Sequence, residues 1–191
     1  YYNLWRKFNF SKLLMNILIT GGLGYIGSHL TVELLKTKSK IFIIDYLSNS
    51  SIKKKKMIER ISKKKVKFFK NDLTDHKKIS LILKKHNIEF VIHLAGLKAV
   101  NESILNPHKY FFNNSFGTLQ LLKAMEDSKT KKIIYSSSAT VYGAVNKNPI
   151  QESGKLRPIN PYGTSKLISE KMIIDYSKTI KNFQYFILRY F

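Results

Sequence analysis

The sequence predicts an α/β fold in which a doubly wound parallel sheet is covered by helices on both faces. From Asn16 onward, short apolar runs alternate with segments of helical spacing, a pattern typical of parallel sheets. A glycine-rich turn joins the first apolar run directly to the first helical segment. Because crossovers between parallel strands are right-handed, six such units predict the strand order 3-2-1-4-5-6 of a Rossmann-type domain.

Each strand is predicted from a short apolar run of the kind that is buried on both faces. The strands are expected at residues 16–20, 40–45, 66–70, 90–96, 131–138 and 183–191. The helices are predicted from apolar residues three and four positions apart, as with Ile26, Leu30 and Leu34 in the first helix. They are expected at residues 25–37, 51–62, 75–86, 106–128 and from Pro161 onward.

The composition indicates one globular domain. The 191 residues are 43% hydrophobic, which is enough for a sizeable core. The chain has no cysteine, which excludes disulfides, thiolate metal ligands and a thiol nucleophile, and we expect a reducing, cytoplasmic compartment. No run approaches the roughly 20 apolar residues of a membrane span, so we expect no membrane partner.

The net charge of +22 raises the question of nucleic-acid binding. The basic residues are mostly lysine, and the arginines are Arg6, Arg60, Arg157 and Arg189. Arginine is the residue most used to read base edges. A lysine-rich composition therefore accounts for the charge better than a specific nucleic-acid partner does, and none is expected.

The two ends of the chain suggest a division into an extension and a truncated domain. The stretch "MNILITGG" at Met15 reads like a natural beginning, so residues 1–14 are expected to be a disordered N-terminal extension. The domain is expected over residues 15–191. It stops inside the strand-like stretch "FQYFILRYF", so we expect truncation at its C-terminal end.

The glycine-rich turn predicts a phosphate-binding loop. In "TGGLGYIG", the glycines Gly21, Gly24 and Gly27 are three residues apart. Glycine permits positive φ and a close approach of the backbone to a ligand. The helix that follows offers free N–H groups and the positive end of its dipole to a pyrophosphate. A strand, this turn and a helix in succession are the context in which such a motif indicates dinucleotide binding.

Asp45 ends the second strand, 18 residues after Gly27. This is near the spacing of about 20 residues at which a carboxylate binds the adenosine ribose. A carboxylate there would repel a 2′-phosphate, so NAD is favoured over NADP; the alternative is a loop aspartate that caps the next turn. Asp72, after the third strand, could reach an adenine amino group or be a plain turn residue.

The stretch "PYGTSK" places Tyr162 four residues before Lys166, on one face of a helix. A tyrosine is a poor base at neutral pH, but a nearby cation favours its phenolate. Ser138 or Thr140, at the end of the fifth strand, could hydrogen-bond a substrate oxygen during proton transfer. A chance Tyr–Lys pair on a solvated helix is the alternative, but the preceding glycine loop favours a catalytic role.

The histidines predict no metal site. His93 lies in an apolar strand, where a buried, hydrogen-bonded histidine is more common than a catalytic one. The other histidines have no ligand spacing; they are His29, His76, His86 and His108.

Four stretches together carry a family resemblance. The stretches "TGGLGYIGSHL", "HLAGLKAVNES", "SSSATVYG" and "PYGTSK" resemble the UDP-glucose 4-epimerases of the extended short-chain dehydrogenase/reductase superfamily. The glycine loop and the Tyr-x-x-x-Lys pair are common to the superfamily, whereas "AGLKAV" with "ES" and "SSSATVYG" are more specific. The resemblance runs from about Met15 to Phe191.

The resemblance implies tightly held NAD and the interconversion of UDP-glucose and UDP-galactose through a 4-keto sugar. It implies that Tyr162 takes the proton of the sugar 4-hydroxyl, that Lys166 binds the nicotinamide ribose and lowers the Tyr162 pKa, and that Ser138 orients the 4-oxygen. Further residues match cofactor contacts of the family: Tyr25, Ile26, Asp45, Asp72, Leu73, Leu94, Ala95, Gly96, Lys98, Asn113 and Phe191. A homodimer through helices near 106–127 and 161–180 is expected by the same analogy.

The departures from the family pattern leave alternatives open. Tyr46 follows Asp45 where the family commonly has Asn, and Asn101 stands where Gly is frequent. The family continues past "LRYF" into a domain that grips the UDP-sugar, so we expect little or no turnover from this chain alone. The alternatives are a nucleotide-sugar 4,6-dehydratase, which usually needs an Asp-Glu pair where this chain has "SATVYG", and a non-catalytic NAD-binding module.

Overall fold

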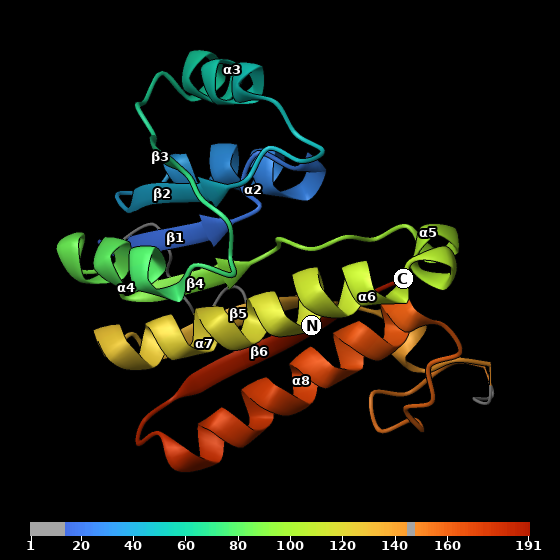
Figure 1. Ribbon diagram of the computed structural model, residues 1–191. Coiled ribbons are helices and arrows are strands. Elements are labelled where there is room, and N and C mark those ends of the chain that lie inside the picture. The colour runs from blue at the N-terminus through green and yellow to red at the C-terminus, as the bar shows by residue number, and fades with distance from the viewer. Residues whose placement is uncertain (1–13, 145–147) are drawn as a thin grey trace.

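The protein contains one parallel sheet with helices on both faces, as Figure 1 shows for the computed structural model. Residues 14–144 and 148–191 are described. The strands lie in the order β3-β2-β1-β4-β5-β6, which confirms the predicted order 3-2-1-4-5-6. Their bounds are Asn16–Thr20 (β1), Lys40–Asp45 (β2), Lys67–Lys70 (β3), Phe90–His93 (β4), Lys132–Ser138 (β5) and Gln184–Tyr190 (β6).

The helices cover the sheet in two groups because successive residues of each strand point to opposite faces. On one face, Leu18 and Ile44 pack with α4, α7 and α8; on the other, Ile17 and Ile43 pack with α2 and α3. The bounds are Tyr25–Leu35 (α2), Ile52–Ser62 (α3), His76–Lys85 (α4), Val100–Leu105 (α5), Pro107–Tyr110 (α6), Gly117–Ser128 (α7) and Pro161–Thr179 (α8). This two-sided burial explains why the strands read as continuous apolar runs.

The register of the sheet brings the carboxyl ends of the strands to one edge. Thr20 on β1 pairs with Ile44 on β2 and with His93 on β4. Ser138, the last residue of β5, pairs with Tyr190 on β6. Segments that leave these strand ends therefore lie side by side, although they are far apart in the sequence.

The prediction of one helix over residues 106–128 is wrong in its detail. The segment comprises α6, a π-helical turn at Phe111–Phe116 and α7, and α5 precedes it where no helix was predicted. Asn106 separates α5 from α6, which begins at Pro107, since proline restricts the residue before it to non-helical backbone. The π-helical turn contains Asn114, whose side chain bonds outside the helix. A hydrophobic pattern does not reveal such an interruption.

The expected extension at the start of the chain stays untested. Of the predicted extension 1–14, only Leu14 lies within the described residues, and it is exposed. The division between residues 14 and 15 therefore stays a prediction.

Within residues 14–144 and 148–191, no helix is long and apolar enough to cross a membrane.

Candidate active site

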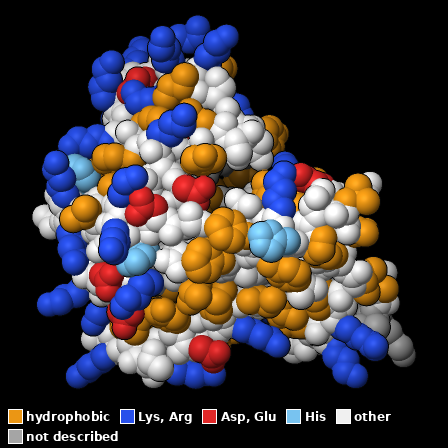
Figure 2. All heavy atoms as spheres, in the orientation of Figure 1, with side chains coloured by type: hydrophobic (Ala, Val, Ile, Leu, Met, Phe, Trp, Pro, Cys, Tyr) orange, Lys and Arg blue, Asp and Glu red, His pale blue; other side chains and the backbone are white. Residues whose placement is uncertain are grey.

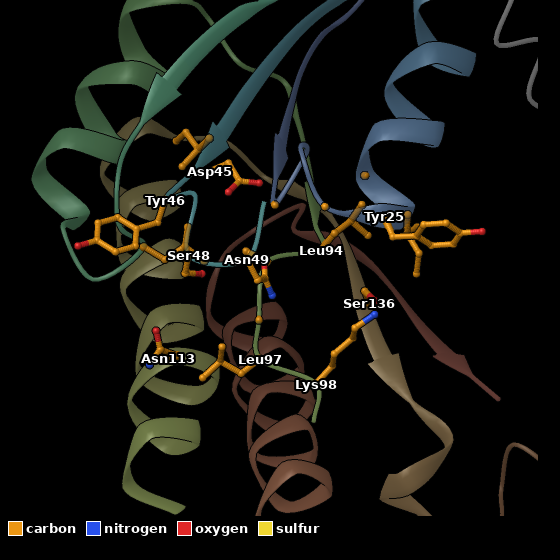
Figure 3. A pocket seen from close by; sticks show the side chains of 18 of the residues that line it. Tyr25, Asp45, Tyr46, Ser48, Asn49, Leu94, Leu97, Lys98, Asn113 and Ser136 are labelled. Carbon is orange, nitrogen blue, oxygen red and sulfur yellow. The ribbon is translucent and has the colours of Figure 1, made fainter. Parts of the chain in front are cut away.

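A cavity of about 270 Å³ opens at the carboxyl ends of β1, β2 and β4. Figure 3 shows its walls, which come from the glycine loop, the β2–α3 loop, the segment after β4 and the π-helical turn. The predicted cofactor residues that line it are Gly21, Gly24, Tyr25, Ile26, Gly27, Asp45, Asp72, Leu73, Leu94, Ala95, Gly96, Lys98 and Asn113. The structure thus brings together residues that span almost a hundred positions of the sequence.

The glycine loop makes the tight turn that its sequence predicts. Gly21 has a φ of 69°, and a Cβ on it would stand 2.7 Å from the backbone nitrogen of Ala95. A Cβ on Gly27 would stand 2.3 Å from the carbonyl oxygen of Gly21. Side chains are therefore excluded where β1, the loop and α2 meet. Gly24 precedes α2 and provides no side-chain cap, so the first N–H groups of α2 stay available at the cavity.

Asp45 lies at the end of β2 and is almost buried. Its Oδ2 accepts a hydrogen bond from the Leu23 N–H at 3.1 Å, and its Oδ1 accepts from the Leu47 N–H at 2.9 Å and the Ser50 hydroxyl at 2.8 Å. Asp45 therefore fastens the glycine loop to the β2–α3 loop. Because a carboxylate has about four acceptor positions, it retains capacity for a ligand hydroxyl. The turn-capping alternative and the ribose-binding prediction are thus compatible.

The cavity wall after β3 combines turn residues with apolar packing. Asp72 accepts hydrogen bonds from the backbone N–H and the hydroxyl of Thr74, at 2.8 and 2.9 Å, so it is a turn residue that also lines the cavity. Leu73 packs against Gly117, and Asn113 donates to the Lys109 carbonyl at 2.8 Å. Lys98 is exposed, and its side chain extends in the direction of Ser136 in Figure 3.

Asn114 holds the segment after β4 in place. It is buried in the π-helical turn, accepts a hydrogen bond from the Leu97 N–H at 2.8 Å and donates to the Leu97 carbonyl at 3.0 Å. It also donates to the Ser165 hydroxyl at 3.0 Å, and that hydroxyl bonds the Tyr162 carbonyl at 2.7 Å. One amide side chain therefore connects the cavity wall to the start of α8.

Tyr162 lies in the first turn of α8, which Asn160 caps by accepting from the Gly163 N–H at 2.8 Å. Burial raises the pKa of Tyr162, and a hydrogen bond with Ser138 offsets part of that rise. The Ser138 hydroxyl oxygen accepts from the Thr140 hydroxyl at 3.0 Å. Tyr162, Ser138 and Thr140 thus form one connected group.

Lys166 follows Tyr162 by one helical turn and is buried. Its ammonium group donates to the Ser136 carbonyl at 2.8 Å and lies 4.9 Å from the centre of the Tyr135 ring. Burial lowers the pKa of Lys166 to about 8, against an opposing effect of Glu170. The expected lowering of the Tyr162 pKa by Lys166 is not found in the protein alone, because the burial of the phenol dominates and raises that pKa.

The predicted catalytic group of Tyr162, Lys166 and Ser138 adjoins the cavity rather than lining it. Ser136, which accepts the Lys166 hydrogen bond, is part of the cavity wall. A Cβ on Gly96, also in that wall, would stand 3.5 Å from the Lys166 Nζ. Phe191 does not line the cavity. It is 88% exposed and packs on Tyr142, with ring centroids 6.3 Å apart. Its role as a cofactor contact stays a prediction.

Several lining residues were not predicted from the sequence. They are Ile44, Tyr46, Ser48, Asn49, Lys54, Asn71 and Ser136. Most of them follow a strand end within a few residues, so extending each strand-end motif along its loop would have found them. Asn114 could have been suspected because the polar run "NNS" interrupts the phenylalanines of "FFNNSFG".

His93 is buried between two hydroxyl groups, as predicted. Its ring nitrogens bond the hydroxyls of Thr20 at 2.7 Å and Thr118 at 3.0 Å. Burial lowers its pKa to about 3, so the ring is neutral at physiological pH.

Among residues 14–144 and 148–191, no group of three or more His, Asp or Glu side chains could hold a metal ion.

Comparison with known proteins agrees with this architecture. The family model described as "GDP-mannose 4,6 dehydratase" matches residues 18–191. The UDP-glucose 4-epimerase of Bacillus subtilis is 45% identical over 177 residues, which cover 93% of this chain and 52% of the relative. The chain therefore spans about half the length of the curated relatives it matches.

Solved structures give the same result. The UDP-glucose 4-epimerase of Stenotrophomonas maltophila, with bound NAD and formylated UDP-arabinopyranose, has a TM-score of 0.90 and 38% identity. That match covers 93% of this chain and 53% of the other. The UDP-glucose 4-epimerase of Bifidobacterium longum, in complex with NAD⁺ and UDP, has a TM-score of 0.89 and 41% identity, covering 92% and 53%.

Proposed function

The chain belongs to the family described as GDP-mannose 4,6 dehydratase, and on that premise we propose that it is the NAD-binding part of a UDP-glucose 4-epimerase. One observation carries the proposal: Tyr162, bonded to Ser138, and Lys166 adjoin a cavity whose far wall is a glycine loop. An acid–base group next to a phosphate-binding loop fits the oxidation and reduction of a nucleotide-linked alcohol.

The residues around the cavity fit NAD. Gly21, Gly24 and Gly27 leave the loop backbone open to a pyrophosphate, and the uncapped start of α2 provides N–H donors. Asp45 would accept hydrogen bonds from the adenosine ribose, and its charge would disfavour a 2′-phosphate. The other contacts would come from the lining residues named above. When bound, NAD would supply a hydride acceptor and donor, together with a positively charged nicotinamide ring.

Tyr162 would take and return the proton of the sugar 4-hydroxyl. Because its pKa is raised in the protein alone, it is protonated at neutral pH until nearby positive charge favours the phenolate. Lys166 would provide part of that charge. Ser138, with Thr140 bonded to its oxygen, would hold the 4-oxygen within reach of the phenol.

A nucleotide-sugar 4,6-dehydratase is the second candidate, because the matching family is described by that activity. Such an enzyme usually needs an Asp-Glu pair just after the fifth strand. In this chain the turn after β5 is Ala139–Val141, followed by Tyr142 and Gly143, and none of these residues has a carboxyl group. The local chemistry therefore favours the epimerase.

Low turnover by the 191 residues alone is part of the proposal. The chain spans about half of its relatives, so contacts that their other half makes have no counterpart in these residues. Catalysis depends on holding the reacting groups in near-attack geometry.

A role in galactose metabolism and a cytoplasmic location also stay predictions.

We further propose a homodimer through the apolar surface formed by Phe112, Phe116 and Ile168. These side chains are exposed on the π-helical turn and on α8, and Phe112 and Phe116 stack with ring centroids 5.3 Å apart. Figure 2 shows hydrophobic side chains gathered over these elements, whereas Lys and Arg gather over α3. Pairing would remove this surface from water.

Incubation of a longer protein, in which this chain is joined to a second half like that of its relatives, with NAD and UDP-galactose tests the reaction type. An epimerase yields UDP-glucose, which has the same mass as the substrate. A 4,6-dehydratase yields a 4-keto-6-deoxy sugar that is lighter by one water. NAD binding without either product would support the non-catalytic module instead. Chromatography with mass spectrometry separates the three outcomes.

A further inference from the structure

Glu170 lies one helical turn beyond Lys166 and outside the group described so far. Tyr162, Lys166 and Glu170 are four residues apart on α8, so they lie on one face of the helix. Only 1% of Glu170 is exposed. A carboxylate this deeply buried needs charged or hydrogen-bonding partners to remain ionised.

The partners of Glu170 come from two neighbouring strands. The Ser137 hydroxyl on β5 donates to its Oε1. Arg189 on β6 donates from Nε to Oε1 at 3.1 Å and from Nη2 to Oε2 at 2.8 Å. Ser137 and Arg189 are paired in the sheet, so the carboxylate joins α8 to both strands at their carboxyl ends.

This contact lies next to the atoms that hold Lys166. The Lys166 ammonium group bonds the carbonyl of Ser136, the residue before Ser137. Arg189 in turn donates to the Tyr142 hydroxyl at 2.8 Å and the Glu152 carbonyl at 3.1 Å. The Glu170–Arg189 pair therefore connects the helix, the end of β5 and the turn that contains Ser138 and Thr140.

We propose that Glu170 is a positioning residue that keeps the Lys166 ammonium group charged and in place on the Ser136 carbonyl. The proposed effect of Glu170 on Lys166 concerns groups within the 191 residues, and its importance for catalysis rests on the proposed function. Arg189 balances the buried carboxylate and fixes its orientation through two parallel hydrogen bonds.

The charge state of Lys166 depends on the groups that face it from several elements. These are Glu170 on the same helix, Tyr135 on β5 and His93 on β4, and Glu170 is itself paired with Arg189 on β6. His93 is neutral at physiological pH, and burial raises the pKa of Tyr135 far above that range. Glu170 is therefore the negative charge in this group that favours the ammonium form of Lys166.

Competitive amine labelling of the 191-residue protein over a range of pH, with mass spectrometry of the Lys166 peptide, tests this inference. The wild-type midpoint is expected near pH 8. In Glu170→Gln it should fall by about one pH unit or more, because the opposite charge is lost. Asp175→Asn, which removes an exposed carboxylate from the same helix, should leave the midpoint unchanged.

A second variant covers the case in which the neutral glutamine leaves Arg189 unpaired and the protein unfolds. Glu170→Gln combined with Arg189→Met removes both buried charges and should lower the midpoint by less than Glu170→Gln alone, because loss of the arginine's positive charge offsets part of the effect. An unchanged Lys166 midpoint in either folded variant overturns the inference. The labelling requires neither NAD nor turnover, so failure of the proposed function would appear separately, as absence of NAD binding or product.

Discussion

At the scale of single residues, the proposed chemistry depends on the phenol of Tyr162 and the hydroxyl of Ser138. The phenol is nearly buried and has a raised pKa, so its deprotonation needs favourable charge nearby. Ser138 is bonded on its other side by Thr140, which leaves its own proton free to point toward the phenol or a substrate oxygen.

Tyr162→Phe should retain NAD binding and lose turnover. The substitution removes the acid–base group and leaves the ring packing, so the loss in rate should be about a hundredfold or more. Tyr176→Phe, near the end of the same helix, is the control and should keep the wild-type rate. Product formation from UDP-galactose, measured on the chain joined to a second half like that of its relatives, gives the rates, and calorimetry gives NAD affinity. Equal rates for Tyr162→Phe and wild type would remove Tyr162 from the mechanism.

His93 should make the protein less stable in mild acid. Its pKa is about 3 in the folded protein and about 6.5 when unfolded, so the unfolded chain binds the extra proton between these values. The free energy of unfolding should therefore fall by about 2 kcal/mol between pH 7 and pH 5 because of this residue.

Urea unfolding at the two pH values measures the difference. His93→Gln should be less stable overall but should lose this part of the pH dependence. His29→Asn, which alters an exposed histidine on α2, should behave like wild type. If His93→Gln kept the full difference, another group would be its source.

Among the residues, Tyr162, Lys166 and Ser138 could be predicted because their spacing and strand-end context have a chemical meaning. Glu170 continues the same four-residue spacing, but its partner Arg189 lies on a strand nineteen positions later. Only the pairing of β5 with β6 shows that the two meet beside Ser137. Such pairs depend on register, which the sequence does not state.

At the scale of elements, the glycine loop and the helix after it could be predicted almost to the residue, whereas the segment from α5 to α7 could not. Glycine spacing reports a local backbone requirement that the sequence carries directly. The π-helical turn forms where Asn114 bonds Leu97 and Ser165, and these partners come from other parts of the chain. Tertiary contacts override a simple helical pattern there.

Gly21→Ala should destabilise the fold. The positive φ alone costs about 1–2 kcal/mol, and the added methyl group would meet the Ala95 backbone at 2.7 Å. Gly117→Ala is the matched control, since its Cβ would make an ordinary contact with Leu73 at 3.4 Å within α7. That variant should be neutral or up to about 1 kcal/mol more stable. Thermal unfolding compares the two; similar effects of both substitutions would contradict the tight-turn account.

At the scale of the whole molecule, the charge and the apolar surface lie on different elements. Four consecutive lysines, Lys53 to Lys56, lie on α3, while Phe112, Phe116 and Ile168 are exposed on the π-helical turn and α8. This separation allows an apolar surface to pair with a second copy without bringing the lysine-rich helix into the contact.

Phe112→Glu should prevent the proposed homodimer, because pairing would then bury two like charges. Leu81→Glu, on the exposed side of α4, is the control and should leave the association state unchanged. Light scattering during size-exclusion chromatography gives the mass in solution. A wild-type protein that stays monomeric at high concentration would contradict the dimer.

The central claim is that this chain binds NAD at the cavity formed by the glycine loop and Asp45. Calorimetric titration of the 191-residue protein with NAD, and separately with NADP, tests it most directly. The account predicts one NAD per chain and binding of NADP at least about tenfold weaker, because Asp45 disfavours the 2′-phosphate. Absence of NAD binding, or equal binding of the two cofactors, would contradict it.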